Sequence, residues 1–318
     1  MNLKNAISAA VLSAGVCLAA TSHAEEQKIV IGVSIPAADH GWTGGLDFHA
    51  EQAIKRLEKQ YPNVEIILKT ASNATEQVNV IEDMNSGHKL TALVVLPFES
   101  APLTAPVKDI HSQGVYVTVV DRGLSEDGIE DFHIAGDNPA LGREAALYIN
   151  SRLPQGGSVV AMRGLPTEID NQRVEGFKTA LAGNIKILDE KHSNWNRDEG
   201  FAVMQDYLQR FPHIDAVWTQ DDDTTLGVID AARQAGREGE FFIVGGGGMK
   251  QVVQMVKDGS RKDVPVTVSY PPSMIATAIE LTAEHFVSKI PLDGRYILNT
   301  SLITKENADL FYFPDSPY

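Results

Sequence analysis

Cysteine is nearly absent from the 318-residue sequence, which contains only Cys17. A chain with one cysteine forms no internal disulfide, so a disulfide-stapled scaffold is excluded and a core of apolar residues must hold the fold together. Positive charge is also scarce, because 27 Lys and Arg stand against 42 Asp and Glu, for a formal net charge of −15. Nucleic acids and anionic membranes attract basic faces. The balance therefore argues against both and favours a small, uncharged partner.

Long hydrophobic runs are missing except near the start. Lys4 precedes an apolar run over 6–20, and small residues at Ser22 and Ala24 flank His23. This pattern predicts a signal peptide over 1–24, cleaved near Ala24, and a periplasmic location. A membrane anchor is disfavoured because about fifteen apolar residues are fewer than the roughly twenty that span a bilayer. A lipoprotein at Cys17 is disfavoured because Val16 stands where such signals prefer a very small residue.

The familiar motifs of enzymes and metal sites are missing as well. The glycines at 245–248 have the spacing of neither a dinucleotide nor a P-loop motif, and no H-E-x-x-H, nucleophile elbow, C-x-x-C or EF-hand calcium loop occurs. The region after the signal peptide has no thiol nucleophile. We therefore predict no catalysis, no cofactor and no metal site.

What the sequence does contain is a regular alternation of strands and helices. Near-continuous apolar runs, typical of strands buried on both faces, lie at 28–34, 64–70, 92–97, 115–120, 158–162, 185–189, 216–219, 241–244 and 264–269. Amphipathic helical patterns separate them, including 168–183, 197–211, 223–235, 248–258 and 273–288. The alternation predicts an α/β fold of two doubly wound parallel-sheet domains with a cleft between them. In such sheets ligands bind beyond the carboxyl ends of the strands.

Polar and aromatic side chains follow these predicted strands. They are Asp39, His40, Trp42, Asp121, Arg122, Asn171, Arg173, Trp195, Asp221 and Tyr270, together with the glycines at 245–248. Carboxylate, guanidinium and amide groups pair with buried hydroxyls, and an indole covers the C–H face of a sugar ring. Structural alternatives stay open for single residues: the tryptophans as packing, the Asp121–Arg122 pair as a surface ion pair, and the acids at 221–223 as a helix start.

Several strings together resemble the ribose-type periplasmic sugar-binding proteins, the solute receptors of ATP-driven importers. They are IGVSIP with a following GW, VVDRG at 119–123, HIAGDN at 133–138, RVEGF at 173–177, AVWTQDDDTTLG at 216–227 and VSYPPSMIA at 268–276. The resemblance implies a type I periplasmic binding protein, a monomer whose two domains are joined by a three-strand hinge. Its lobes would be 25–135 plus 271–298 and 136–270 plus 299–318. Tyr270 and strands near 135–138 and 298–300 would lie at the hinge.

The resemblance also assigns roles to individual residues. It places His40 and Trp42 in the first ligand loop, next to Asp39, and it makes Asp121 and Arg122 a sugar-binding pair. Asn171 falls where the family has an arginine, whereas Arg173 matches an arginine that is structural. Trp195 matches an aromatic wall, and Asp221 matches a sugar contact, with Asp222 behind it as a helix cap. At Gly246 and Gly247 the sequence departs from the family, which has an aromatic residue and an aspartate there. Glycine leaves space or exposes backbone N–H groups. A larger sugar, a different furanose or pyranose, or an open-chain polyol stay open as ligands.

The function implied is capture of a sugar or sugar alcohol and its delivery to the permease of an ABC importer. The alternative is a sugar sensor that reports to a chemotaxis or histidine-kinase receptor instead of, or as well as, a permease. A sugar-sensing transcriptional regulator shares the implied fold, but it requires a helix-turn-helix segment ahead of the first strand, and the export signal stands there.

Overall fold

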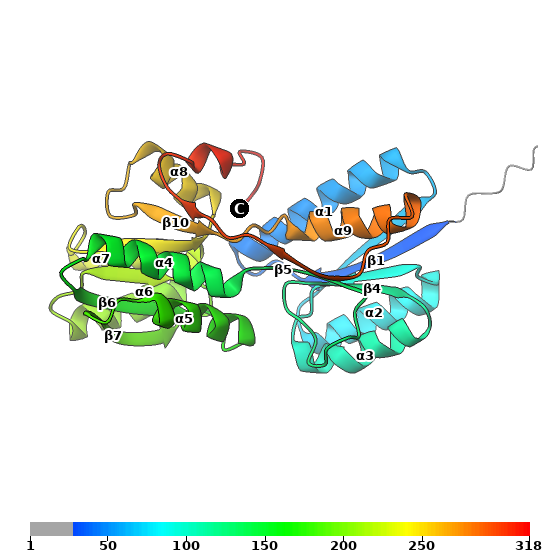
Figure 1. Cartoon of the computed structure of the whole chain (residues 1–318), viewed down its shortest axis with the longest axis horizontal. Helices are drawn as coiled ribbons and strands as arrows, with labels where there is room; N and C mark the ends of the chain where they lie inside the picture. The colour runs from blue at the N-terminus through cyan, green and yellow to red at the C-terminus, as the bar shows by residue number, and fades with distance from the viewer. Residues whose placement is uncertain (1–27) are drawn as a thin grey trace, which may run out of the picture.

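The computed structural model describes residues 28–318, so the predicted signal peptide over 1–24 lies outside the described residues. The chain forms two α/β lobes placed side by side along the long axis of the molecule (Figure 1). No helix within the described residues is long and apolar enough to cross a membrane.

The first lobe is built on a six-stranded sheet in which all neighbouring strands are parallel. Its order is β11 (Gly294–Leu298), β5 (Phe132–Gly136), β4 (Tyr116–Val120), β3 (Ala92–Val95), β1 (Ile29–Pro36) and β2 (Val64–Ala71). Strands β1, β3 and β5 are buried along their whole length. Such strands read as continuous apolar runs, which is why the sequence predicted β1 and β3.

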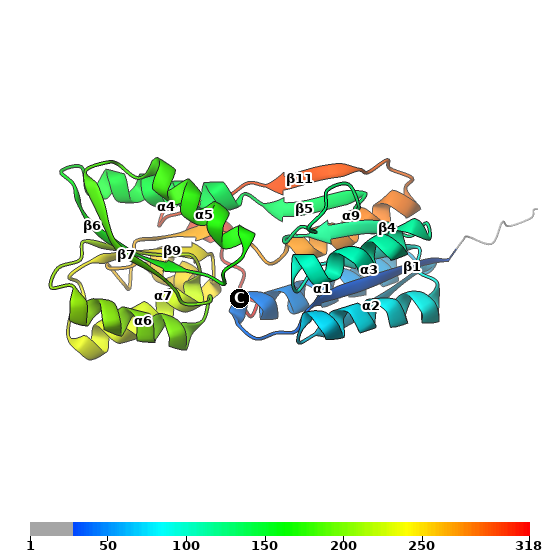
Figure 2. The same cartoon turned by 90° about the horizontal axis from the view of Figure 1, so that it is seen from below.

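Helices cover both faces of this sheet (Figures 1 and 2). Helix α1 (Gly41–Gln60) packs beside α9 (Met274–Val287) on one face, and α2 (Ala74–His88) packs beside α3 (Ser100–Ser112) on the other. The start of α2 is fixed by Asn73, whose side chain accepts a hydrogen bond of 2.9 Å from the backbone N–H of Glu76. Because the two helix layers cover the faces of the sheet and not its ends, the carboxyl ends of the strands face the second lobe.

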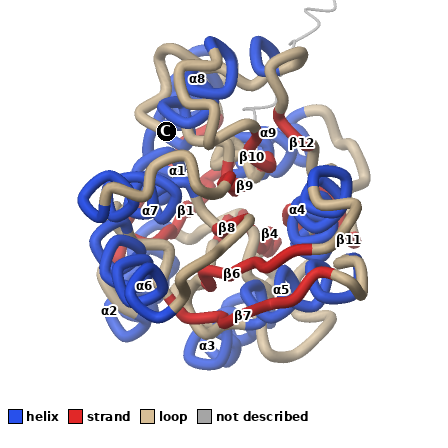
Figure 3. Tube along the Cα trace, turned by 90° about the vertical axis from the view of Figure 1, so that its left-hand side faces the viewer, coloured by secondary structure: helices blue, strands red, loops and turns tan. Residues whose placement is uncertain are grey.

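The second lobe repeats the plan with a sheet of its own. Its order is β12 (Leu302–Ile303), β10 (Val266–Ser269), β9 (Phe242–Gly247), β8 (Ala216–Thr219), β6 (Gly157–Arg163) and β7 (Ile185–His192). Every pairing is parallel except that of β12 with β10. Figure 3 looks along the long axis and shows this sheet between two layers of helices.

One layer holds α4 (Asn138–Arg152) and α5 (Glu168–Ala180), and the other holds α6 (Arg197–Arg210) and α7 (Asp222–Ala235), with α8 (Lys250–Asp258) beside β10. A short 3-10 helix, η1 (Ala308–Leu310), packs on α8. Trp218 of β8 stacks on Phe177 of α5 with ring centroids 4.1 Å apart, and both rings are buried in the core of this lobe.

The chain crosses between the lobes three times. The crossings follow β5, β10 and β11, and backbone hydrogen bonds hold them together: Asp137 N–H donates to Leu298 O (3.1 Å) and Ser269 N–H donates to Ser301 O (2.9 Å). The predicted fold class, two parallel-sheet domains on a three-strand hinge, is therefore confirmed. The strand expected near 135–138 overlaps β5, which begins three residues earlier.

Candidate ligand-binding site

A small cavity of about 30 Å³ lies between the lobes at the carboxyl ends of β4, β8, β9 and β10. Nine of its lining residues are ones singled out from the sequence: His40, Trp42, Asp121, Arg122, Arg173, Trp195, Asp221, Gly247 and Tyr270. Two more, Ile169 and Gln220, complete the lining. The two lobes therefore contribute to one cavity, as the position of ligands in open parallel sheets leads one to expect.

Asp121 sits at the turn that follows β4. Its backbone is left-handed, with φ of 59°, a conformation that costs a residue other than glycine about 1 kcal/mol or more. Its N–H donates to Ile134 O (2.8 Å), and its carbonyl accepts from His133 Nε2 (3.1 Å). The carboxylate accepts a short hydrogen bond from the Tyr270 hydroxyl. The backbone bonds hold the carboxylate at the cavity despite the strained turn.

A chain of polar contacts runs from Asp121 into the second lobe through Tyr270. The Tyr270 hydroxyl accepts from Asn138 Nδ2 (3.1 Å), and Asn138 Oδ1 accepts from Arg173 Nε (2.8 Å). Arg173 Nη1 donates to Gln220 O (3.2 Å). Since all these groups are buried, each bond satisfies a polar atom that water does not reach.

Aromatic rings form the apolar part of the cavity. Trp42 and Trp195 are each 7% exposed, and each indole N–H is bonded, to Tyr270 O (2.9 Å) and to Gln220 Oε1 (3.4 Å) respectively. The guanidinium carbon of Arg173 lies 4.4 Å from the ring centroid of Tyr270 and 5.4 Å from that of Trp195. With their polar atoms satisfied inside the protein, the indoles are left to offer ring surface to a ligand.

Arg122 brings a cation that is only partly bonded. Its Nη1 donates to Phe98 O (2.5 Å) and lies 3.5 Å from Pro97 O, so the guanidinium is anchored to the loop after β3. Its Nε is buried and has no hydrogen-bond partner. A buried N–H without a partner is costly, so this atom is a candidate donor to a ligand hydroxyl.

A cluster of charges joins the lobes beside the cavity. Asp223 Oδ2 of the second lobe accepts from the Gly41 N–H of the first (2.9 Å), and His40 Nδ1 lies 2.5 Å from Asp39 Oδ1. Burial, followed by the charge of Asp223, raises the pKa of Asp221 to about 7. Burial lowers the pKa of His40, but the bond to Asp39 and the charge of Asp221 outweigh it, so the net direction is upward.

The neighbouring acids have different roles from the expected ones. Asp221 is the N-cap of α7, where its Oδ1 accepts from Asp223 N–H (2.8 Å) while the residue also lines the cavity. Asp222, expected as the cap, instead braces the glycine loop after β9. Its carboxylate accepts from Gly246 N–H (3.1 Å), Gly248 N–H (3.0 Å), Met249 N–H (2.9 Å) and Thr267 Oγ1 (2.9 Å).

Two residues named from the sequence do not line the interlobe cavity. Asn171 lies on the face of α5 away from it, and its Oδ1 accepts from Arg163 Nη2 (2.8 Å). Its place is taken by Arg173, which lies on the buried face of the same helix. Asp39 is also outside the lining: its carboxylate holds His40 and accepts from Thr43 Oγ1 (2.9 Å). Arg173 lines the cavity and Asn171 does not, because only the face of α5 that carries Arg173 is buried.

The space expected beside Gly247 is not free. The side chain of Tyr318 occupies it, and a Cβ built on Gly247 would overlap the Tyr318 hydroxyl. Gly246 has no room either, since a Cβ there would lie 2.7 Å from Gln220 O. The volume that a side chain would fill at these glycines is therefore taken by other parts of the chain, although Gly247 still lines the interlobe cavity. Glycine is required because other parts of the chain approach the backbone closely.

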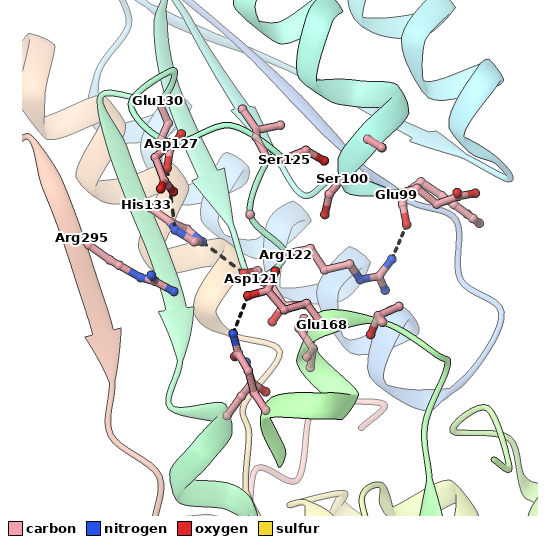
Figure 4. A pocket seen from close by; sticks show the side chains of 18 of the residues that line it. Glu99, Ser100, Asp121, Arg122, Ser125, Asp127, Glu130, His133, Glu168 and Arg295 are labelled. Atoms are coloured by element: carbon pink, nitrogen blue, oxygen red, sulfur yellow. Dashed lines mark hydrogen bonds and ion pairs between the residues drawn. The ribbon is translucent and has the colours of Figure 1, made fainter. Parts of the chain in front are cut away.

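A larger cavity of about 650 Å³ adjoins the first and shares Asp121, Arg122 and Ile169 with it. Figure 4 shows its polar walls, with His133, Glu130 and Arg295 at one side and Glu99 and Ser100 at the other. It is lined from both lobes, since Thr167 and Glu168 also contribute. Within residues 28–318, no group of three or more His, Cys, Asp and Glu side chains is placed to hold a metal ion.

Comparison with known proteins agrees with this arrangement. A sequence model of the periplasmic binding protein domain matches residues 31–289. The ribose import binding protein of Escherichia coli K12 is 26% identical over 96% of this chain and 100% of its own length. The xylitol-binding protein of Mycolicibacterium smegmatis is 30% identical over 78% of this chain and 71% of its own.

Solved structures show the same fold. An ABC transporter solute-binding protein from Bacillus halodurans C-125, crystallised with myo-inositol, superposes with a TM-score of 0.80 at 22% identity over 93% of this chain and 100% of its own. Since the family model spans well over half of the sequence and both sheets of the fold, this chain belongs to the periplasmic binding protein domain family.

Proposed function

We propose that this chain is a monomeric periplasmic receptor that binds one uncharged sugar or sugar alcohol between its lobes and delivers it to an ABC importer. The signal peptide is cleaved near Ala24. The observation that carries the proposal is the pair of adjoining interlobe cavities, of about 30 and 650 Å³, which share Asp121 and Arg122; both lobes supply hydrogen-bonding side chains to them, and the smaller one adds aromatic side chains.

The charges of the cavity support an uncharged ligand. The carboxyl groups of Asp121 and Asp221 and the guanidinium groups of Arg122 and Arg173 all line the cavity, and the raised pKa of Asp221 leaves its carboxyl group partly protonated at neutral pH. A charged ligand of either sign would meet groups of its own sign in this buried site. Hydroxyls accept from guanidinium N–H groups and donate to carboxylates, so a polyhydroxy compound satisfies both kinds.

Binding and closure are one event in this proposal. The lobes touch directly through the Gly41–Asp223 hydrogen bond, and Tyr270, at a crossing, reaches Asp121. In the open form the two sets of ligand contacts are apart, so a ligand that bridges them favours the closed form. The permease then recognises the closed shape.

The ligand is held and released without chemical change. Among the cavity residues, the carboxylate of Asp121 is bonded to Tyr270 and that of Asp221 caps a helix, so neither is placed as a free acid–base pair around one bond. Release therefore depends on reopening of the lobes rather than on a reaction.

A calorimetric screen of the exported protein tests the proposal. The probes are glycerol, ribose, xylitol, allose and myo-inositol, with glutamate and citrate as charged controls. We expect saturable one-to-one binding of at least one uncharged probe, recovery of that probe unchanged by mass spectrometry, and no binding of the charged controls. Absence of binding to every polyol and sugar, or preference for a charged control, would contradict the proposal.

A further inference from the structure

The segment 311–318 returns from the second lobe to the interlobe region. Figures 1 and 2 mark the end of the ribbon between the two lobes. Tyr318 is 4% exposed there, whereas Phe313, earlier in the same segment, is 54% exposed. Of these two aromatic side chains, Tyr318 is thus the one buried between the lobes.

The second lobe anchors the segment. Upstream, Phe311 and Tyr312 pack against the apolar cluster that includes Val253 and Val256 of α8. Closer to Tyr318, the Lys250 ammonium donates to Pro314 O (3.2 Å) and, through a short bond, to Ser316 O. The Tyr318 N–H donates to Ser316 Oγ (3.2 Å). These contacts fix the direction in which the phenol ring points.

The ring of Tyr318 lies in a cradle of three glycines drawn from both lobes. A Cβ on Gly41 or Gly45 of α1 would lie 3.0 Å from Tyr318 Cδ2 or 2.9 Å from Tyr318 Cβ, and a Cβ on Gly247 would overlap its hydroxyl. Any side chain at these positions would displace the ring. Since α1 belongs to the first lobe and Gly247 to the second, the cradle is complete only when the lobes are closed.

The hydroxyl of Tyr318 is buried and has no hydrogen-bond partner. Burial, and then the charge of Asp221, raises the pKa of this phenol, so it stays neutral and able to donate. It lies against Gly247, which lines both the interlobe cavity and a second small cavity, whereas Tyr318 itself lines the second. A buried, unpaired hydroxyl separated from the interlobe cavity by one glycine calls for a partner from outside the chain.

We propose that Tyr318 is a specificity-determining residue of the interlobe site: its ring replaces the side chain that position 247 lacks and limits ligand size, and its hydroxyl bonds to the ligand. The inference rests on the proposed function, because it assumes a polyhydroxy ligand in the cavity. The residue acts only in the closed form, in which both halves of the glycine cradle meet.

Three variants test this inference: Tyr318→Ala removes the ring, Tyr318→Phe removes only the hydroxyl, and Phe313→Ala is the matched control on the exposed side of the same segment. Dissociation constants are measured by calorimetry for the series from glycerol through ribose and xylitol to myo-inositol. The readout is the ratio of affinities for large and small probes, which a general loss of stability does not change.

For Tyr318→Ala we expect the ratio of affinities to shift about tenfold towards the larger probes. For Tyr318→Phe we expect the order of affinities by probe size to persist, while the tightest probe binds about tenfold more weakly because one hydrogen bond is lost. Phe313→Ala should match the wild type. An unchanged ratio in Tyr318→Ala, or unchanged affinity in Tyr318→Phe, would overturn the inference while wild-type binding upholds the proposed function. A wild type that binds no probe would overturn both.

Discussion

Replacement of Arg122 by lysine probes the unpaired donor at the ligand cavity. Lysine keeps the positive charge, and its ammonium is able to donate to Phe98 O, which now accepts from Arg122 Nη1 at 2.5 Å. What the substitution removes is Nε, the buried N–H that has no partner within the protein. Arg122→Lys therefore leaves the anchor to the loop and deletes the donor offered to the ligand.

The magnitude follows from that one bond. A hydrogen bond that involves a charged group contributes about 1.5–3 kcal/mol net. Each 1.4 kcal/mol is a factor of about ten in affinity, so the dissociation constant should rise about 10- to 150-fold. The free energy of unfolding of the ligand-free protein should change little, because Nε makes no bond there.

Titration calorimetry with the tightest uncharged ligand measures the first quantity, and urea denaturation without ligand measures the second. Arg295→Lys serves as the control, since Arg295 lines only the larger cavity and is exposed. A change in affinity of less than threefold in Arg122→Lys would refute the assignment of Nε to the ligand. So would an equal weakening in Arg295→Lys, because the effect would then reflect overall charge.

Three further predictions concern other residues of the cavity. The pKa of Asp221 is raised to about 7 in the folded state, so between pH 5 and 7 the folded protein keeps a proton on Asp221 that the unfolded chain has released. The free energy of unfolding should therefore fall by about 1 kcal/mol for each unit that the pH rises over this range. Asp221→Asn should flatten that slope in denaturation measured across this range, and an unchanged slope would exclude Asp221 as its source. Tyr270→Phe should lower the free energy of unfolding by about 1–3 kcal/mol, because Asp121 and Asn138 lose their shared partner. It should also tighten ligand binding, because the Asp121 carboxylate is then free to accept a hydrogen bond from a ligand hydroxyl; weaker binding in calorimetry would contradict this. Trp195→Phe should reduce the ligand-induced change in tryptophan fluorescence, whereas Trp218→Phe, in the buried core, should not; equal responses would place Trp195 outside the ligand contacts.

The strands and the fold class were accessible from the sequence for a simple reason. Strands buried on both faces are continuous apolar runs, and β1 (IVIGVSIP) is buried at all eight positions. The first residues of strand β5 were harder to see because they include a buried histidine, His133, whose Nε2 is satisfied by Asp121 O. A polar residue that a distant carbonyl satisfies is indistinguishable, in sequence, from a loop residue.

The site residues divide in the same way. Residues that directly follow a strand, such as Asp121 and Asp221, were found because the parallel sheet places all such positions at one edge. On α5 the residues Ile169, Arg173 and Phe177 repeat every four positions on the buried face, so helical periodicity already separated Arg173 from Asn171. Position after a predicted strand singled out both residues, and resemblance to a family then favoured Asn171 and made Arg173 structural, against that local signal.

Tyr318 left no such signal. Its neighbours in space, Gly41, Gly45 and Gly247, are distant in sequence, and glycine at a strand end has many causes. The sequence pointed to the missing side chain at position 247 but not to the ring that replaces it. Only the tertiary path of 311–318 brings the two together.

The unpaired groups explain why closure should depend on a ligand. Closure buries the carboxylates of Asp221 and Asp223 near each other, and the raised pKa values of both show that burial disfavours their charged forms. It also buries Arg122 Nε and the Tyr318 hydroxyl without partners. Against these costs stand few direct bonds between the lobes, such as that from Gly41 to Asp223. A ligand that supplies hydroxyls to the unpaired groups removes costs that exist only in the closed form, and this difference in affinity between the two forms is what shifts their populations.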